Sequence, residues 1–339
     1  MMAWREIEAF LEEIKNELGR LPRDLHVTRM CCALIAISDG RILRMQEPRL
    51  HYCPYYKRLY DLGFTDTREL VLREVERKIR GLGYFTPKRE VCRADVAVPF
   101  GASEIMMYAL MKGEIDAAVV VCDGAGTVIT SNPYLVQGIG AHMNGLFYTS
   151  PIREVIERIR LAGGRVLSPE TAKIDQLEGL KKAIEIGYRR IAVTINGFAG
   201  EPLEEVRRIE KEANVAAFIL VVCTTGVSRE RAEEIAEYAD VVWGCASKHV
   251  REVAGIKARL QLGVRIPVFI LTERGIGLVS SYFSEDLRRY VGAGERYLVT
   301  LHPRELDKCV RVSVGDFSAY LQRVDRLPVE ADDSPKPLL

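Results

Sequence analysis

Three apolar stretches of the sequence each end in a cysteine. DAAVVVCDGAG reaches Cys122, FILVVCTTG reaches Cys223, and DVVWGCAS reaches Cys245. Such apolar runs are typical of buried strands, and α/β folds bind their ligands where parallel strands end. Thiolates from distant sequence positions can jointly hold a soft metal ion or an iron–sulfur cluster. The pattern therefore predicts converging thiol ligands, and its alternative is that these small apolar side chains only pack.

A second group of cysteines lies in the N-terminal part of the chain. Cys31 and Cys32 are adjacent in an apolar stretch, and Cys53 lies in HYCPYY between aromatic residues and a proline. Because neighbouring side chains on a strand face opposite ways, we expect only one of Cys31 and Cys32 to point into a given site. No C-x-x-C pair occurs, so the local signature of a zinc ribbon is absent. The predicted metal ligands, in one site or two, are Cys32, Cys53, Cys92, Cys122, Cys223 and Cys245.

Glycine and small polar residues follow the same strands and favour an anion site instead. Small residues let a backbone approach a phosphate or carboxylate, and helix N-termini direct N–H groups at it. No complete dinucleotide or P-loop motif is present. The glycine-dense segment 130–151 is predicted to be a long loop that closes over the site as a lid. The predicted ligand-binding residues are Asp123, Gly124, Gly126, Thr127, His142, Asn196, Thr224, Thr225 and Ser247.

Charge and hydropathy exclude several classes of protein. The 339 residues include 48 Lys and Arg against 47 Asp and Glu, so there is no basic field to attract nucleic acid. No apolar run reaches the ~20 residues that span a bilayer. The first residues, MMAWREIEAFLEEIKNELGR, are too charged for a signal peptide. These features predict a cytoplasmic protein, whose eight cysteines would stay free of disulfides.

Apolar strands and amphipathic helices alternate in the second half of the chain. This alternation predicts an α/β fold with a parallel sheet over about residues 164–275, flanked by helices as in Rossmann-like folds. The expected strands are 165–168, 189–195, 217–223, 240–244 and 266–271. The expected helices are 151–162, 174–186, 201–213, 228–238 and 248–261.

The first half predicts a separate N-terminal α/β lobe. Residues 26–47 are expected to form a β-hairpin around Asp39-Gly40, a dipeptide that suits a tight turn. Residues 94–100 are expected to form a strand. A single distorted barrel is the alternative to two lobes. The predicted divisions are an amphipathic helix in 1–25, the N-terminal lobe 26–150, a Rossmann-like lobe 151–283, a C-terminal helix and strands 284–324, and a disordered tail 325–339.

Several stretches together resemble an archaeal protein family. They are HVTRMCCALIAISDGRILRMQEP, VVVCDGAGTVITSNPYLVQGIGAHMNGLFYTSPI and ADVVWGCASKHVRE, within about residues 26–285. They resemble the family called methanogenesis marker protein 8. The resemblance implies an anaerobic archaeal cytoplasm, in which iron–sulfur chemistry and nickel-cofactor biogenesis are common. It supplies no catalytic residues, and the catalytic residues remain unknown.

Three functions follow as expectations. The first is an accessory protein of methanogenesis that binds a metal or an iron–sulfur cluster through cysteines, in the maturation or activation of methyl-coenzyme M reductase or a related redox enzyme. The second is an α/β enzyme that binds a phosphorylated or carboxylated small molecule at the strand ends. The third is a non-catalytic subunit that docks on a methanogenesis enzyme complex through its N-terminal helix and acidic tail. The sequence leaves open whether the protein is an enzyme, and it predicts neither nucleic acid nor membrane as a partner.

Overall fold

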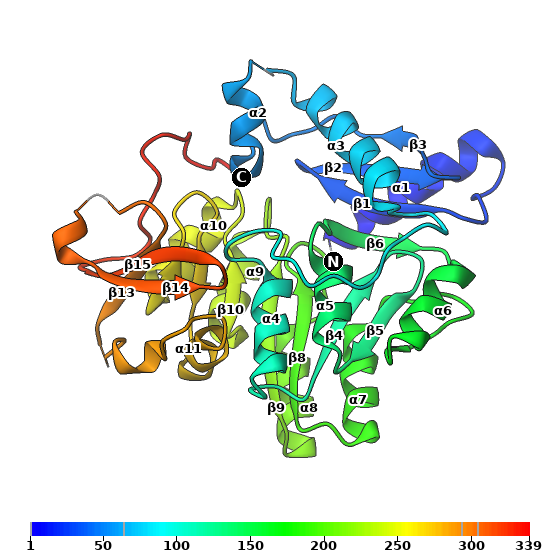
Figure 1. The fold of residues 1–339 in the computed structure, drawn as a ribbon. Coiled ribbons are helices and arrows are strands. Elements are labelled where there is room, and N and C mark those ends of the chain that lie inside the picture. The colour runs from blue at the N-terminus through cyan, green and yellow to red at the C-terminus, as the bar shows by residue number, and fades with distance from the viewer. Residues whose placement is uncertain (1, 64, 293, 304) are drawn as a thin grey trace.

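The computed structural model describes residues 2–63, 65–292, 294–303 and 305–339 (Figure 1). Its strands form a small antiparallel sheet and a large mixed sheet, which confirms the predicted α/β class. The small sheet has the order β3-β2-β1-β6. Its strands are β1 (His26–Met30), β2 (Ala33–Ser38), β3 (Arg41–Met45) and β6 (Gly145–Thr149).

The large sheet has the order β14-β15-β13-β11-β12-β10-β9-β8-β4-β5-β7. At its centre, β4, β8, β9 and β10 run parallel, as the alternation of strands and helices predicted. Its strands are β4 (Ala117–Cys122), β5 (Gly126–Thr130), β7 (Arg165–Val166), β8 (Arg190–Asn196), β9 (Ala216–Val222), β10 (Val241–Trp243), β11 (Leu260–Leu262), β12 (Val268–Ile270), β13 (Arg296–Thr300), β14 (Val310–Val314) and β15 (Phe317–Val324).

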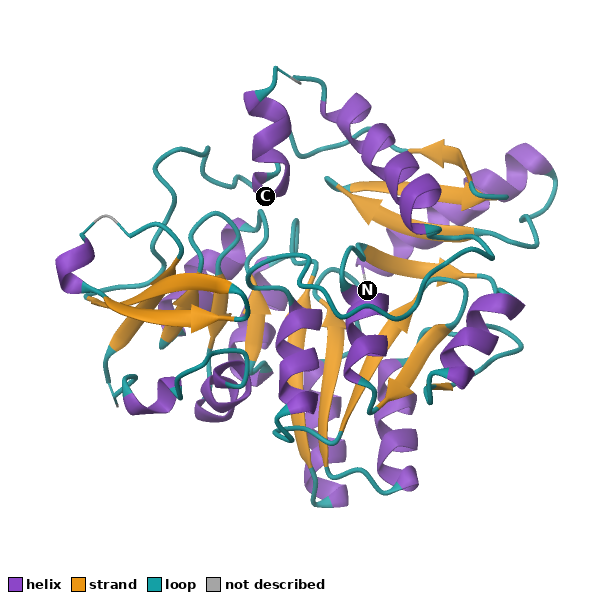
Figure 2. Ribbon diagram, in the orientation of Figure 1, coloured by secondary structure: helices purple, strands orange, loops and turns teal. Residues whose placement is uncertain are grey.

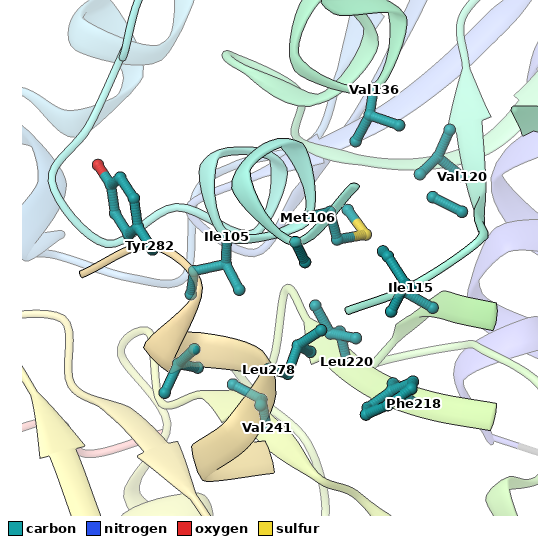
Figure 3. Packing of buried hydrophobic residues seen from close by; sticks show 14 of the residues in the cluster. Ile105, Met106, Ile115, Val120, Val136, Phe218, Leu220, Val241, Leu278 and Tyr282 are labelled. Carbon is teal, nitrogen blue, oxygen red and sulfur yellow. The ribbon is translucent and has the colours of Figure 1, made fainter. Parts of the chain in front are cut away.

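Helices cover both faces of the large sheet (Figure 2). One face packs against α4 (Ala102–Met111), α5 (Pro133–Gly140), α6 (Arg153–Leu161) and α11 (Glu273–Ser280). The other packs against α7 (Gln176–Ile186), α8 (Leu203–Ala213), α9 (Arg229–Tyr238) and the turn that begins with α10 (Lys248–Val250). Alternate residues of a strand serve the two cores, as Val119 and Val120 of β4 do. Figure 3 shows Ile105 and Met106 of α4 in the first core, near Leu220 of β9.

The small sheet is likewise covered on both faces. The amphipathic helix α1 (Met2–Leu18) buries Ile7, Phe10 and Ile14 against one face. Helix α3 (Thr67–Leu82) packs on the other, and α2 (Lys57–Asp61) precedes it. The predicted hairpin at Asp39-Gly40 is confirmed, because β2 and β3 pair across a turn in which both residues have positive φ. No helix among the described residues is both long and apolar enough to cross a membrane.

Two local predictions were wrong. Residues 94–100, all of them described, contain no strand, because the N–H groups of Ala97 and Val98 donate to the Glu104 carboxylate rather than to a neighbouring strand. The predicted lid over 130–151 is helix α5 followed by β6. Asn132 caps this helix by accepting from the N–H groups of two of its first residues. Gly138 serves close packing, since a Cβ there would lie 2.1 Å from the Val91 carbonyl oxygen.

The prediction of a parallel sheet over 164–275 was wrong at both ends, because β7 pairs antiparallel with β5 and β12 is antiparallel to both of its neighbours. The helix expected over 248–261 stops early, and the last residues of that range form β11. A tight hairpin then inserts β12 between β11 and β10, antiparallel to both. The carboxyl end of β12 therefore lies at the opposite edge of the sheet, where Thr272 and Arg274 bind the Asp240 carboxylate.

The chain passes back and forth between the two sheets. Strands β4 and β5 lie within 26–150 and pair in the large sheet, whereas β6 pairs in the small one. Residues 325–339 contact both parts: Ser334 Oγ lies 3.1 Å from Tyr52 Oη, and the Leu339 oxygen accepts from the Lys248 N–H at 2.5 Å. The division into domains and the disorder of this tail stay predictions.

A buried histidine ties β1 to β6. His26 is 1% exposed, and its Nδ1 lies 2.6 Å from Thr149 Oγ1. Burial lowers the pKa of His26 to about 4, although the charges of Asp123 and Asp24 oppose the shift. A histidine that stays neutral in the folded protein makes its full contribution to stability above the pKa that it has in the unfolded chain. This contribution is lost as the pH falls through the lower pKa that it has in the folded protein. We expect the free energy of unfolding to fall by about 3 kcal/mol between pH 6.5 and 4.

Chemical denaturation at several pH values checks this expectation. His26→Gln should flatten the acid limb of the stability curve, whereas the same change at the exposed His51 should leave that limb unchanged. Equal curves for His26→Gln and the unaltered protein would show that other groups control acid unfolding.

Candidate functional site

A cavity of about 1100 Å³ lies between the small sheet and the carboxyl ends of β8, β9 and β10. The small sheet contributes the turn between β1 and β2 and the start of β6. The large sheet contributes residues at the carboxyl ends of its parallel strands, namely Asn196, the last residue of β8, and Cys223 and Cys245, which follow β9 and β10. A cavity of this size can hold a cofactor or another small molecule. It occupies the edge at which parallel sheets bind ligands.

Five cysteines line this cavity, and we call them the cavity cysteines: Cys31, Cys32, Cys53, Cys223 and Cys245. They come from the β1–β2 turn, from the loop before α2, and from the ends of β9 and β10. Four of them belong to the predicted metal ligands. The other two predicted ligands lie outside the cavity. Cys92 is exposed, and Cys122 is buried in the core beside β5.

Both cysteines of the β1–β2 turn reach the cavity. Met30 pairs with Ala33, so Cys31 and Cys32 are the two turn residues, with φ of 49° and 64°. Turns with positive φ at both positions usually contain Asn-Gly, because larger side chains disfavour that conformation. The expectation that only one of the two would face the site was wrong, since it assumed a strand. A turn does not alternate its side chains between two faces.

The two cysteines at the strand ends have the same unusual backbone. Cys223 follows β9 with φ of 58°, and Cys245 follows β10 with φ of 43°. Four cavity cysteines thus adopt a left-handed conformation, which costs about 1–3 kcal/mol for each residue other than glycine. Strain of this kind is found at functional sites more often than elsewhere, where the fold over-determines the backbone. The strain therefore marks these four positions as a candidate site.

Cys53 is the cavity thiol that its surroundings favour in the ionised form. Its pKa is lowered by a hydrogen bond from the Cys31 thiol, by the N–H groups of Tyr55 and Tyr56, and by the charge of Lys78. The same hydrogen bond, with burial, raises the pKa of Cys31. The pair therefore favours loss of the proton from Cys53 rather than from Cys31, and a thiolate is the form that binds metals and attacks electrophiles.

Burial keeps the thiols at the strand ends protonated. It raises the pKa of Cys223 to about 12, and the nearby Cys245 adds to this shift. Burial also raises the pKa of Cys245. Since each of these two thiols responds to another cavity cysteine, the cavity cysteines are close enough to interact electrostatically.

Two buried cations beside the thiols were missed by the sequence reasoning. Lys78 on α3 donates to Asn144 Oδ1 and lies 3.8 Å from Glu74, and burial lowers its pKa to about 8. Arg29 on β1 is 8% exposed and also lines the cavity. Arg29 gave no clear signal in the sequence, because three of the five residues of its strand, HVTRM, are polar or charged. Lys78 gave none either, because it lies in a helix rich in charged residues.

The structure brings only some of the predicted ligand-binding residues to the cavity. His142, Asn196 and Thr225 line it, and burial lowers the pKa of His142 to about 4. Thr224 is buried and donates to the Trp243 carbonyl at 2.6 Å. The remaining residues have structural contacts elsewhere: Ser247 caps α10, Thr127 binds Gln176, Gly126 packs on Ala172, Gly124 donates to Thr149, and Asp123 pairs with Arg89.

The donor set suits soft metals, but its spacing does not suit a single ion. Among the residues that the structure describes, no group of three or more His, Cys, Asp or Glu side chains is close enough to hold one metal ion. A single ion needs every sulfur within ~2.3 Å of it. An iron–sulfur cluster spaces its thiolates further apart, because each one binds a different iron. Within the described residues, the cavity cysteines therefore do not form a ready-made site for a single ion.

Comparisons with known proteins agree with an archaeal origin for this fold. The chain is similar to the uncharacterized protein MJ0054 of Methanocaldococcus jannaschii, with 39% identity over 310 residues, which cover 91% of this chain and 96% of that protein. Residues 26–283 match the family described as uncharacterized protein conserved in archaea, DUF2099. This match covers the small sheet, the large sheet except β13, β14 and β15, and all the cavity cysteines. The chain therefore belongs to the DUF2099 family.

Proposed function

We propose that this protein binds an iron–sulfur cluster, or another soft metal centre, through its cavity cysteines. The observation that carries the proposal is the convergence of five cysteines from distant parts of the sequence on one cavity. Packing alone does not account for this arrangement, because four of these cysteines have a strained backbone. A cysteine that only filled space would more readily adopt an ordinary conformation.

The charges around the cavity support an anionic occupant. Lys78 is buried 3.8 Å from Glu74, but the buried Arg29 pairs with no carboxylate that the structure describes, and burying a cation is costly unless a negative charge compensates for it. Thiolates, and the clusters that they hold, supply negative charge. The two cations would in turn stabilise the ionised form of the ligating thiols.

We further propose that the protein is an accessory factor of methanogenesis. The resemblance to methanogenesis marker protein 8 supports this role, which would place the protein in an archaeal cytoplasm. The expected partner is a methanogenesis enzyme complex, such as methyl-coenzyme M reductase or a related redox enzyme during its maturation or activation. A cavity lined by two parts of the chain suits a protein that holds a reactive centre between them.

Metal analysis of anaerobically purified protein tests the proposal. The protein should be prepared without a metal-binding tag, and its iron, zinc, nickel and acid-labile sulfide should be measured together with its visible spectrum. We expect about four irons and four sulfides per chain and a broad visible absorption band, as for a cubane cluster held by cysteine. A colourless, metal-free protein that is stably folded would contradict the proposal.

A second candidate is an enzyme that binds a phosphorylated or carboxylated small molecule at the strand ends. The position of Asn196 and Thr225 in the cavity supports it, since both are polar residues at the carboxyl ends of parallel strands. Binding of such a molecule to the metal-free protein, with chemical conversion of the molecule, would favour this candidate over the first.

A further inference from the structure

The guanidinium group of Arg29 is held in the cavity by a hydrogen bond from one of its nitrogen atoms and by a contact of its flat face with an aromatic ring. Its Nη1 donates to the Thr225 carbonyl oxygen at 2.9 Å, across the boundary between the small and the large sheet. Its guanidinium carbon lies 3.7 Å from the centre of the Phe198 ring, within the range of a cation–π contact. The guanidinium therefore keeps one orientation, which lowers the entropy lost when it binds a ligand.

The remaining edge of this guanidinium has no acceptor. Nε and Nη2 of Arg29 are buried, and neither forms a hydrogen bond with any residue that the structure describes. In Arg77, the same two atoms hold the Glu74 carboxylate at 2.9 and 2.7 Å. In Arg93, they hold Asp95 at the same two distances. Arg29 thus presents a bidentate oxyanion fork that this chain elsewhere fills with its own carboxylates.

The residues around the fork leave it without a carboxylate. A Cβ on Gly226 would lie 3.2 Å from Arg29 Nη2 and 3.5 Å from Cys32 Sγ, so these two groups face the same glycine. The nearby Glu6 is held by Arg49 at 3.0 Å. A buried charged donor left unpaired costs more free energy than an ordinary missing hydrogen bond. Such a cost is expected where a ligand completes the pairing.

We propose that Arg29 is the oxyanion-binding residue of the cavity, and that the natural ligand is a small molecule with a carboxylate or phosphate group. This inference rests on the proposal that the cavity is the ligand site, but it requires no bound metal. The Arg29 fork would anchor the anionic end of the molecule beside Cys32. The rest of the molecule would then lie against the other cavity cysteines, or against a cluster that they hold.

Anion binding to the full, metal-free chain tests this inference. Inorganic phosphate and succinate should be titrated separately by calorimetry, so that the two arms distinguish a phosphate ligand from a carboxylate ligand. We expect one of them to bind, and Arg29→Lys to weaken that binding about tenfold or more, because lysine keeps the charge but lacks the two-pronged edge. Arg208→Lys, a matched change at an exposed arginine on α8 that holds Glu205 through the same two nitrogen atoms, should leave the affinity unchanged.

A measurement on the unaltered protein guards against misfolding of the variants. Phenylglyoxal modifies arginine side chains, and peptide mapping should show that the bound anion protects Arg29 but not the exposed Arg208. Equal affinity in Arg29→Lys, or equal modification with and without the anion, would overturn the role of Arg29. Absence of binding by either anion would overturn the ligand class. Neither result would affect the metal proposal, which the iron and sulfide analysis tests separately.

Discussion

Replacing Cys53 with serine is expected to remove most of the iron and sulfide from anaerobically prepared protein. Cys53 is the cavity thiol that the Cys31 thiol, two backbone N–H groups and Lys78 favour as a thiolate, the form that ligates metals. Serine has a similar size but offers a hard oxygen in place of a soft sulfur. The loss should appear as bleaching of the visible band and as a fall in iron and sulfide per chain.

Two cysteines outside the cavity provide matched controls. Cys92 is exposed, and the Cys309 thiol donates to the Glu305 carbonyl oxygen at 3.1 Å. Serine at either position should leave the metal content unchanged, so a loss there would indicate general damage. Full metal content in Cys53→Ser, with retained folding, would exclude Cys53 as a ligand. Serine at Cys223 and Cys245 together should then decide whether the strand ends contribute.

The sequence predicted the strands and helices correctly where their apolar residues follow a regular pattern that reflects burial. Near-continuous apolar runs predicted β8 and β9, because strands covered by helices on both faces need apolar residues at every position. The order of strand and helix then placed Cys223 and Cys245 at one edge of the sheet. Parallel strands end at the same edge, so this part of the site follows from topology alone.

The rest of the site depends on backbone conformation, which the sequence does not display. Cys31 and Cys32 form a turn that usually contains Asn-Gly, and only the folded structure shows that both line the cavity. The three-residue strand β11 is too short to interrupt a helical pattern. Arg29 becomes a ligand candidate only because two of its buried nitrogen atoms have no hydrogen-bond acceptor, and this can be seen only in the folded structure.

The predicted ligand residue Asp123 has contacts that indicate a structural role, and its replacement should greatly destabilise the fold. Its buried carboxylate accepts from Arg89 Nε at 2.9 Å and from the Phe85 N–H at 2.6 Å. Arg89 also donates to two carbonyl groups of α5 at 3.0 Å each. Asp123→Ala would leave the buried guanidinium without its counter-charge. We expect a loss of about 3–5 kcal/mol in the free energy of unfolding, measured by chemical denaturation.

The comparison with an exposed ion pair separates a structural role from a ligand-binding one. The Asp95 carboxylate, which pairs with Arg93, is largely exposed, so Asp95→Ala should cost only about 0–1 kcal/mol. The double change of Asp123 and Arg89 to Leu and Met should recover much of the stability, because it removes both buried charges at once. If Asp123→Ala instead kept its stability and lost ligand binding, the predicted structural role would be wrong. Asp123 would then contribute to ligand binding although it does not line the cavity. The architecture around Arg89 argues against that outcome, since this pair joins the β4–β5 turn to α5 within the protein interior.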